Sequence, residues 1–439
     1  MLTTVVVLAL VLPQAGDAPE VTVLEPVNLS VEVDAGKTTR LVAIFDRAMS
    51  DAGWSFCGGG PAFPKMKGRP RWVSPEKIEV EVELEPDHEY RLSLNCGSAR
   101  NFKSAGGTPL APVAWSFTTL PAKLPDAAKQ KAENRKALAV LQKVLAGSYS
   151  YYDLRVRDWG KVVKDHEAAI VGAKTTRGWA SAVARMLAAT EDIHLSLRMG
   201  ESFFATGTRA IDPLFRDRLL QKYLTTKGAG DHGIQGRTDD GIGYLMIGAW
   251  SNANAVAAIE TALEGLRDCK ALVVDVRPNS GGDERLAQQV ATWFVEGTKV
   301  YAKNRYRVRP GKDGFGPILE RSVTGNQVAA RRYAGPVVVL TSRYVMSSNE
   351  AFVLMMKQAA DCTVVGQRTF GSSGNPKPHE LGNGVTVVVP SWQSLRPDGT
   401  CFEGEGLAPD VEVAVDVAEL EQRDPILERA LEILREKVK

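Results

Sequence analysis

Between residues 243 and 366 the chain alternates short, continuously apolar runs with segments of helical period, and this alternation restricts the fold more than any other feature. The apolar runs read GYLMIGAW, ALVVDV, PVVVL and CTVVG. A helical segment at 348–360 separates the last two runs. Another separates the first two and carries four apolar side chains on one face: Val256, Ile259, Leu263 and Leu266. Because runs that are apolar throughout are typical of parallel strands covered on both faces, the pattern predicts strand–helix units of an α/β sheet.

Residues 20–120 follow a period of two instead. Stretches such as NLSVEVD, KIEVEVELE and EYRLSLN alternate polar with apolar residues, and Gly, Pro, Asp and Asn separate them. Several such strands within about a hundred residues predict an all-β sandwich. After LPAKLPDAAK, which has the composition of a linker, the period becomes helical from about residue 126. We therefore expect an α/β (α+β) multidomain chain with a boundary near residue 120 and a helical region over 126–200.

The charge and the first residues indicate where the protein acts. A formal net charge of +2 over 439 residues, without a basic run, speaks against nucleic acid or an anionic membrane as a partner. Residues 1–18 combine a short apolar run with small residues, as a secretory signal peptide does, and the run is too short to span a bilayer. No later segment is apolar enough for a transmembrane helix. We expect an exported protein, periplasmic or extracellular, whose oligomeric state the sequence leaves open.

The five cysteines predict neither a disulfide framework nor a metal site. No two of them stand at Cys-x-x-Cys spacing, so we do not expect zinc. Cys57 and Cys96 both fall in the amino-terminal third, where they either pair in an oxidising compartment or remain buried thiols. We assign no chemical role to Cys269, Cys362 and Cys401.

Two strand-to-helix junctions carry unusual residues. DVRPNSGGDE follows the apolar run at 271–276, and TSRYVMSSNEA follows the run at 337–341. Both junctions lie at the carboxyl ends of predicted strands, where open α/β sheets place their sites. A tight turn is the simpler explanation of a Gly-Gly pair. Alternatively, the N–H groups of Gly281, Gly282 and Ser348 form an oxyanion hole for a serine between the two junctions.

Ser347 is that serine, and its sequence context has two interpretations. Ser347 and Glu350 stand three residues apart at the start of a predicted helix, which is the spacing of a capping box. Alternatively, the hydroxyl of Ser347 attacks a substrate. The two roles need not compete, because a serine at the very start of a helix gains oxyanion donors from that placement.

A family resemblance favours the nucleophile. GYLMIGAW, ALVVDVRPNSGGD, VVVLTSRYVMSSNEAF, TVVGQRTFGSSGNP, LGNGVTVVVPSW and PDGTCFEGEGLAPDVEV occur in the order typical of the tail-specific, or carboxy-terminal processing, serine peptidase family. The resemblance covers about residues 130–439. It implies a ClpP/crotonase-like core of ββα units over 201–439, a helical cap over 126–200, and Ser347 as the nucleophile. Residues 20–120 resemble bacterial Ig-like modules that precede catalytic domains.

The resemblance also limits the choice of general base. The carboxy-terminal processing branch uses a lysine in a TFGKG-like segment, whereas this chain reads TFGSSG, with Ser372 in place of that lysine. Lys377 lies five residues further on. The tricorn-core branch takes a histidine from the segment after the helical region, and ATEDIHLSLR resembles that segment, so we expect His194 to be the base. Glu403 in FEGEGLAPD matches the family carboxylate that orients the site, with Glu405 the second choice.

Several alternatives remain open around this base. His379 is a reserve candidate, and Asp192 either caps the helix or partners His194. Ile193 stands where the tricorn pattern has an auxiliary serine. Family members often carry a PDZ domain, but residues 200–240 are too few for one.

Two functions follow from the resemblance. The first is an exported serine peptidase that acts on peptides or unfolded proteins through an acyl-enzyme and needs no metal or organic cofactor. Retention of Ser347, His194 and Glu403 favours it. The second is a non-catalytic protein that binds peptides or apolar ligands on the same fold. The missing lysine and the missing auxiliary serine favour that alternative.

Overall fold

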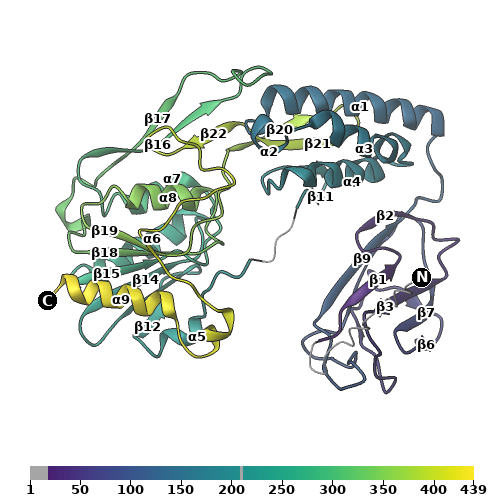
Figure 1. The fold of residues 1–439 in the computed structure, drawn as a ribbon, viewed down its shortest axis with the longest axis horizontal. Coiled ribbons are helices and arrows are strands. Elements are labelled where there is room, and N and C mark those ends of the chain that lie inside the picture. Colours follow the sequence, from purple (N-terminus) through teal and green to yellow (C-terminus); the bar gives the residue numbers. More distant parts are fainter. Residues whose placement is uncertain (1–17, 208–210) are drawn as a thin grey trace, which may run out of the picture. The chain divides into compact units, whose positions relative to one another are not determined.

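The computed structural model describes residues 18–207 and 211–439, so that the predicted signal segment lies outside the described residues apart from Ala18. The chain divides into two compact units (Figure 1). The first unit contains the described residues up to Arg135 together with Glu167–Ala182, and the second contains Lys136–His166 and Val183–Lys439.

Two antiparallel-rich sheets form the β part of the first unit. One contains β1 (Val21–Glu25), β3 (Arg40–Phe45), β5 (Lys65–Met66), β6 (Arg71–Ser74) and β7 (Lys77–Glu83). The other contains β2 (Ser30–Val33), β4 (Phe56–Cys57), β8 (Glu89–Leu94) and β9 (Val113–Thr119). Burial alternates along β7 and β8, as a period of two predicts, and the buried side chains form one apolar core. Cys57 and Cys96 are joined by a disulfide, with their Cα atoms 6.2 Å apart.

Helices follow the β strands. They are α1 (Ala127–Ser148), α2 (Tyr152–Arg155), α3 (Trp159–Gly172) and α4 (Thr176–Leu187). The apolar positions of α4 recur at helical spacing and are all buried: Trp179, Val183, Met186 and Leu187. A short 3₁₀ turn, Ala188–Thr190, ends this helix, and Glu191 then takes a left-handed φ of 50° that stops helical continuation.

A seven-stranded sheet is the centre of the second unit. Its order is β12 (Thr225–Gly228), β13 (Gly233–Arg237), β14 (Ile242–Ile247), β15 (Ala271–Asp275), β18 (Val337–Thr341), β19 (Cys362–Gly366) and β23 (Val411–Glu412). The strands from β14 to β23 are parallel, as the apolar runs predicted. The two amino-terminal strands of this sheet pair antiparallel.

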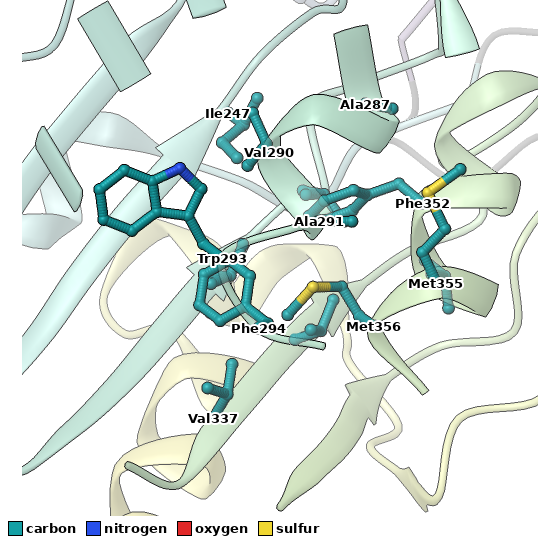
Figure 2. Packing of buried hydrophobic residues seen from close by; sticks show 14 of the residues in the cluster. Ile247, Ala287, Val290, Ala291, Trp293, Phe294, Val337, Phe352, Met355 and Met356 are labelled. Atoms are coloured by element: carbon teal, nitrogen blue, oxygen red, sulfur yellow. The ribbon is translucent and has the colours of Figure 1, made fainter. Parts of the chain in front are cut away.

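Helices cover both faces of this sheet. One apolar cluster packs alternate residues of the central strands against α6 (Ala253–Leu266), α7 (Glu284–Ala291) and α8 (Ser348–Met356). Figure 2 shows part of this cluster, in which Phe352, Met355 and Met356 of α8 lie beside Val290 and Ala291 of α7. A second cluster packs the other strand residues against α9 (Pro425–Lys437), on the opposite face (Figure 1). Burial on both faces explains why these strands are apolar throughout.

Two smaller sheets complete the second unit. One has the order β11 (Ser202–Ala205), β10 (Ser196–Met199), β21 (Thr386–Pro390) and β20 (Pro376–Glu380); the other has the order β17 (Leu319–Thr324), β16 (Thr298–Tyr306) and β22 (Trp392–Leu395). A short helix, α5 (Asp217–Leu220), precedes the central sheet in the chain. Ser196 of β10 pairs with Val388 of β21, and this pairing brings the segment just before β10 to the loop that precedes β20. The result is an α/β fold with additional amino-terminal β sheets. None of the described helices combines the length and the apolar composition that a membrane span requires.

Candidate active site

Ser347 occupies the turn between β18 and α8. Its backbone takes a φ of 58°, and its N–H donates to the carbonyl of Ser372 at 2.8 Å. Its side chain makes no capping hydrogen bond to α8, so the serine half of the capping box is not formed. The left-handed backbone turns the hydroxyl away from the helix, because the side chain of a residue with positive φ leaves the turn in another direction.

Glu350 binds a second segment of the chain besides the start of α8. Its buried carboxylate accepts hydrogen bonds from the Thr369 hydroxyl, from Gly371 N at 2.8 Å and from Ser372 N at 3.0 Å. Burial raises the pKa of Glu350 to about 7, although these hydrogen bonds oppose the shift. The carboxylate therefore fixes the loop at 369–372 against the first turn of α8.

The imidazole of His194 lies between two hydroxyl groups. Its Nε2 is 3.2 Å from Ser347 Oγ, and its Nδ1 is 2.8 Å from Ser372 Oγ. Burial is the main cause of a lowered pKa, which the nearby charge of Asp192 opposes and that of Arg155 assists. The ring is consequently neutral at pH 7, with one nitrogen free to accept a proton.

Asp192 contacts the backbone of His194 rather than its ring. One of its oxygens accepts from His194 N at 2.9 Å and lies 3.9 Å from the ring Nδ1. The other oxygen accepts from the hydroxyl of Tyr149 at 2.8 Å. Two roles were considered for Asp192, a helix cap and a partner of His194. In the structure it accepts a turn-forming hydrogen bond from the main chain of His194 and places a negative charge near the ring.

Glu403 is fully buried but makes no hydrogen bond to His194 in the described chain. Its carboxylate pairs with the guanidinium of Arg155 and accepts from Ser373 N at 2.9 Å. Burial and the charge of Asp192 raise the pKa of Glu403, while Arg155 opposes the shift. The predicted orienting carboxylate thus holds the residue next to Ser372. Glu405, the second choice, is exposed and pairs with surface arginines.

The glycines of the NSGG turn are required by close approaches. Gly281 and Gly282 have φ values of 119° and 136°, which side chains rarely adopt. A Cβ atom on Gly281 would lie 2.9 Å from Ser347 Cβ, and one on Gly282 would lie 2.2 Å from the carbonyl oxygen of Trp250. The turn therefore packs directly against the serine and against the strand-end loop.

Two of the three predicted oxyanion donors remain available. Gly281 N donates to Asn279 Oδ1 at 2.8 Å, so this N–H is already occupied within the turn. The N–H groups of Gly282 and Ser348 have no acceptor among the described residues. The Ser348 hydroxyl is likewise buried without a hydrogen-bond partner there. These groups can donate to a negatively charged oxygen beside Ser347.

Asn349 secures the turn that carries these donors. Its amide donates to the carbonyls of Val276 and Asn279, at 3.1 and 2.9 Å, and its oxygen accepts from the indole of Trp250 at 3.1 Å. The side chain is fully buried. Because one residue of α8 thus bridges both strand-to-helix junctions, the predicted meeting of the junctions at one sheet edge is observed.

An open cleft of about 610 Å³ adjoins Ser347. It is lined by Gly282, Ser347 and Ser348, and also by Lys377 of β20. Lys377 forms no hydrogen bond with Ser347 or His194 in the part of the chain that the structure describes. His379, the reserve base, pairs through its backbone with Val387, and burial lowers its pKa. Of the three candidate bases, only His194 contacts the Ser347 hydroxyl.

Sequence reasoning missed Ser372, Arg155 and Tyr149 as parts of the site. Ser372 carried a signal, since it stands where the resembling family places its base. A residue at such a position lies next to the nucleophile even when its type changes. Arg155 and Tyr149 lie in a helical region without a motif, and no local pattern distinguishes them from surface or core residues.

Comparisons with known proteins agree with the geometry. Residues 241–413 match the model of the family described as Peptidase family S41. The carboxy-terminal processing protease CtpB of Bacillus subtilis is 25% identical over 201 residues, which are 45% of this chain and 39% of that protein. The tricorn protease of Thermoplasma acidophilum is 24% identical over 315 residues, 68% of this chain and 26% of that protein. The chain therefore spans well under half of the length of these curated relatives.

A solved structure shows the same fold. A crystal structure from Parabacteroides merdae superposes with a TM-score of 0.61 and 24% sequence identity, covering 69% of this chain and 96% of that one. At this level of identity the similarity concerns the fold alone.

Proposed function

We propose that this chain, whose residues 241–413 match the model of peptidase family S41, a family of serine-type peptidases, hydrolyses peptide bonds through an acyl-enzyme on Ser347. The observation that carries the proposal is the position of the His194 ring, with Nε2 3.2 Å from the Ser347 hydroxyl. A serine hydroxyl hardly ionises near neutral pH, so it needs such a base.

Acylation begins with two coupled events. Nε2 of His194 accepts the Ser347 proton, and Ser347 Oγ bonds to the carbonyl carbon of the substrate. The carbonyl π electrons move to oxygen, where the N–H groups of Gly282 and Ser348 and the start of α8 stabilise the negative charge. The protonated imidazole then gives its proton to the leaving amine as the C–N bond breaks. Water repeats the sequence on the ester and releases a carboxylic acid.

Ser372 is a positioning residue in this scheme. For Nε2 to accept a proton, the other ring nitrogen must carry one, and Ser372 Oγ at 2.8 Å is its acceptor. Ser372 therefore fixes the tautomer and the direction of the ring, a task that a carboxylate fulfils in many hydrolases. Glu350 and Glu403 support it indirectly, because they bind the N–H groups of Ser372 and Ser373.

The finer assignments belong to the same proposal. We place the chain in a tricorn-core-like branch, with a ClpP/crotonase-like core over 201–439, a helical cap over 126–200 and an Ig-like module over 20–120. We also propose that residues 1–18 direct export to the periplasm or the extracellular space. The disulfide between Cys57 and Cys96 supports export, since such bonds persist in oxidising compartments. Peptides or unfolded proteins are the proposed substrates.

Digestion of an unfolded protein by the purified chain tests this function. We expect wild type to cleave reduced, denatured casein, and Ser347→Ala and His194→Ala each to reduce the rate by at least about 10⁴-fold. Thr261→Ala, which removes a hydroxyl from the exposed side of α6, is the matched control and should keep full activity. If wild type is inert but binds peptides, the non-catalytic alternative is correct instead.

A further inference from the structure

Lys377 lies in the cleft without a role in the mechanism above. It belongs to β20, lines the cleft together with Ser347 and Ser348, and is exposed to solvent. Its ammonium group forms neither an ion pair nor a hydrogen bond with any residue that the structure describes. A cation beside a reactive serine, with no internal partner, is available to a ligand.

The other charged side chains of the cleft neutralise each other. Asp283 pairs with Arg285, with Arg285 Nη2 2.6 Å from the carboxylate. Glu284 pairs with Arg321 at 2.6 Å. Lys377 is the remaining charged side chain of the described cleft lining, which leaves one positive charge in excess.

Further groups in the cleft favour an anion. Both α7 and α8 begin there, and the amino-terminal end of a helix carries partial positive charge. The Ser348 hydroxyl is 93% buried by residue exposure and has no hydrogen-bond partner, although it borders the same space. Lys377 and the Ser348 hydroxyl therefore present unpaired hydrogen-bond donors to a substrate in this cleft.

The backbone of Lys377 is rigidly placed. Its register partner in β21 is Val389, and its two chain neighbours are Pro376 and Pro378. Proline fixes φ and has no N–H, so this short stretch has little conformational freedom and offers few backbone donors to a ligand. Recognition at this point of the cleft accordingly depends on the lysine side chain.

We propose that Lys377 binds a carboxylate of the peptide substrate and thereby selects substrates with an anionic group near the scissile bond. This inference rests on the proposed peptidase function and adds a substrate class to it. The carboxylate has two sources, the free end of a peptide chain or the side chain of an aspartate or glutamate. Either source forms a charge-assisted hydrogen bond with the ammonium group.

Three quenched fluorescent peptides separate these sources. They share one sequence and end in a free carboxylate, in an amide, or in a glutamate followed by an amide. Wild type should cleave the free acid with kcat/KM roughly three- to tenfold above the amide, the difference residing in KM. Lys377→Met should abolish the preference, Lys377→Arg should retain it, and Lys377→Glu should reverse it. Lys227→Met, at an exposed lysine of β12 outside the cleft lining, is the matched control.

The glutamate peptide and salt complete the test. If wild type cleaves the glutamate peptide as fast as the free acid, any carboxylate suffices for recognition. If it cleaves the glutamate peptide only as fast as the amide, Lys377 binds the terminal carboxylate specifically. Both results support the inference, and the preference should shrink as salt rises, since an exposed ion pair is screened. Equal cleavage of all three peptides by wild type, or a preference that survives in Lys377→Met, overturns the inference but not the peptidase function. If wild type is inert, the same comparison is made by binding to Ser347→Ala.

Discussion

A fully buried arginine and a partly buried arginine of the same unit differ in how many of their nitrogens have hydrogen-bond partners. Arg277 is fully buried between Asp275 and Asp424, and its guanidinium also donates to the carbonyl of Leu214 at 2.8 Å. All three of its nitrogens have partners. Arg155 is 12% exposed in its side chain, pairs with Glu403, and has an Nε without any hydrogen-bond partner in the described chain.

The electrostatics of the two clusters differ accordingly. Burial works against the charge of Arg277, but Asp275 and Asp424 outweigh it and raise the pKa of this guanidinium. Asp424 is also the N-cap of α9, so the cluster ties this helix to the end of β15. Near Arg155, burial and the charge of Asp192 raise the pKa of Glu403, and the charges of Asp192 and Arg155 act in opposite directions on the pKa of His194. One cluster ties α9 to the end of β15, and the other places charged groups near the candidate base, where they act on its pKa.

The largest expected effect comes from a substitution that breaks the Arg277 cluster. Arg277→Met leaves two buried carboxylates without their partner, and we expect a loss of about 3–5 kcal/mol in the free energy of unfolding. Urea denaturation followed by circular dichroism measures it. Arg155→Met is the comparison and should lose clearly less, because Arg155 satisfies fewer groups. Equal losses in both variants would contradict the contrast between the clusters.

Ser372→Ala tests the surroundings of His194 and leaves both Arg277 and Arg155 in place. The ring of His194 loses its Nδ1 acceptor, so we expect kcat to fall about 10- to 100-fold while KM stays nearly constant. The free energy of unfolding should change little. Ser372→Thr keeps a hydroxyl and should recover much of the rate. A rise in KM at unchanged kcat would assign Ser372 to substrate binding instead.

Asp192→Asn tests how the charges near Arg155 act on the pKa of His194, and it has the smallest expected effect on activity. In wild type, burial lowers the pKa of His194 below its usual 6.5, while Asp192 raises it. Activity requires the neutral ring, so kcat/KM falls as pH decreases through this pKa. Without the Asp192 charge we expect the acid limb to move to lower pH. A pH profile of kcat/KM measures the shift, and a move to higher pH would refute the assigned sign.

The sequence predicted the parts of this molecule that have local patterns. The parallel strands and their helices could be predicted from the apolar runs, because a strand that is buried on both faces has apolar side chains at nearly every position. The pairing of His194 with Ser347 came from family resemblance rather than from spacing, since 153 residues separate them. The contact of His194 with Ser372 spans 178 residues and has no signature of its own.

The expectations that the structure does not reproduce concern side chains and backbone groups whose direction depends on specific contacts in the folded chain. Ser347 has the spacing of a capping residue, but its positive φ directs the hydroxyl elsewhere. Gly281 was expected to donate to an oxyanion, yet Asn279, two residues earlier, takes its N–H. Glu403 lies near the site, as the resemblance implied, but Arg155 from the helical region binds it. In each case, one long-range or backbone-specific contact decides the outcome.

Labelling with a fluorophosphonate probe tests the central claim most directly, because the probe forms a stable adduct with a serine only when that serine is activated. Mass spectrometry of the intact chain and of its peptides locates and quantifies the adduct. We predict one adduct on Ser347, at a rate that falls steeply in His194→Ala and as the pH decreases through the lowered pKa of His194. No adduct on the folded wild-type chain, or an adduct that persists in Ser347→Ala, would contradict the account.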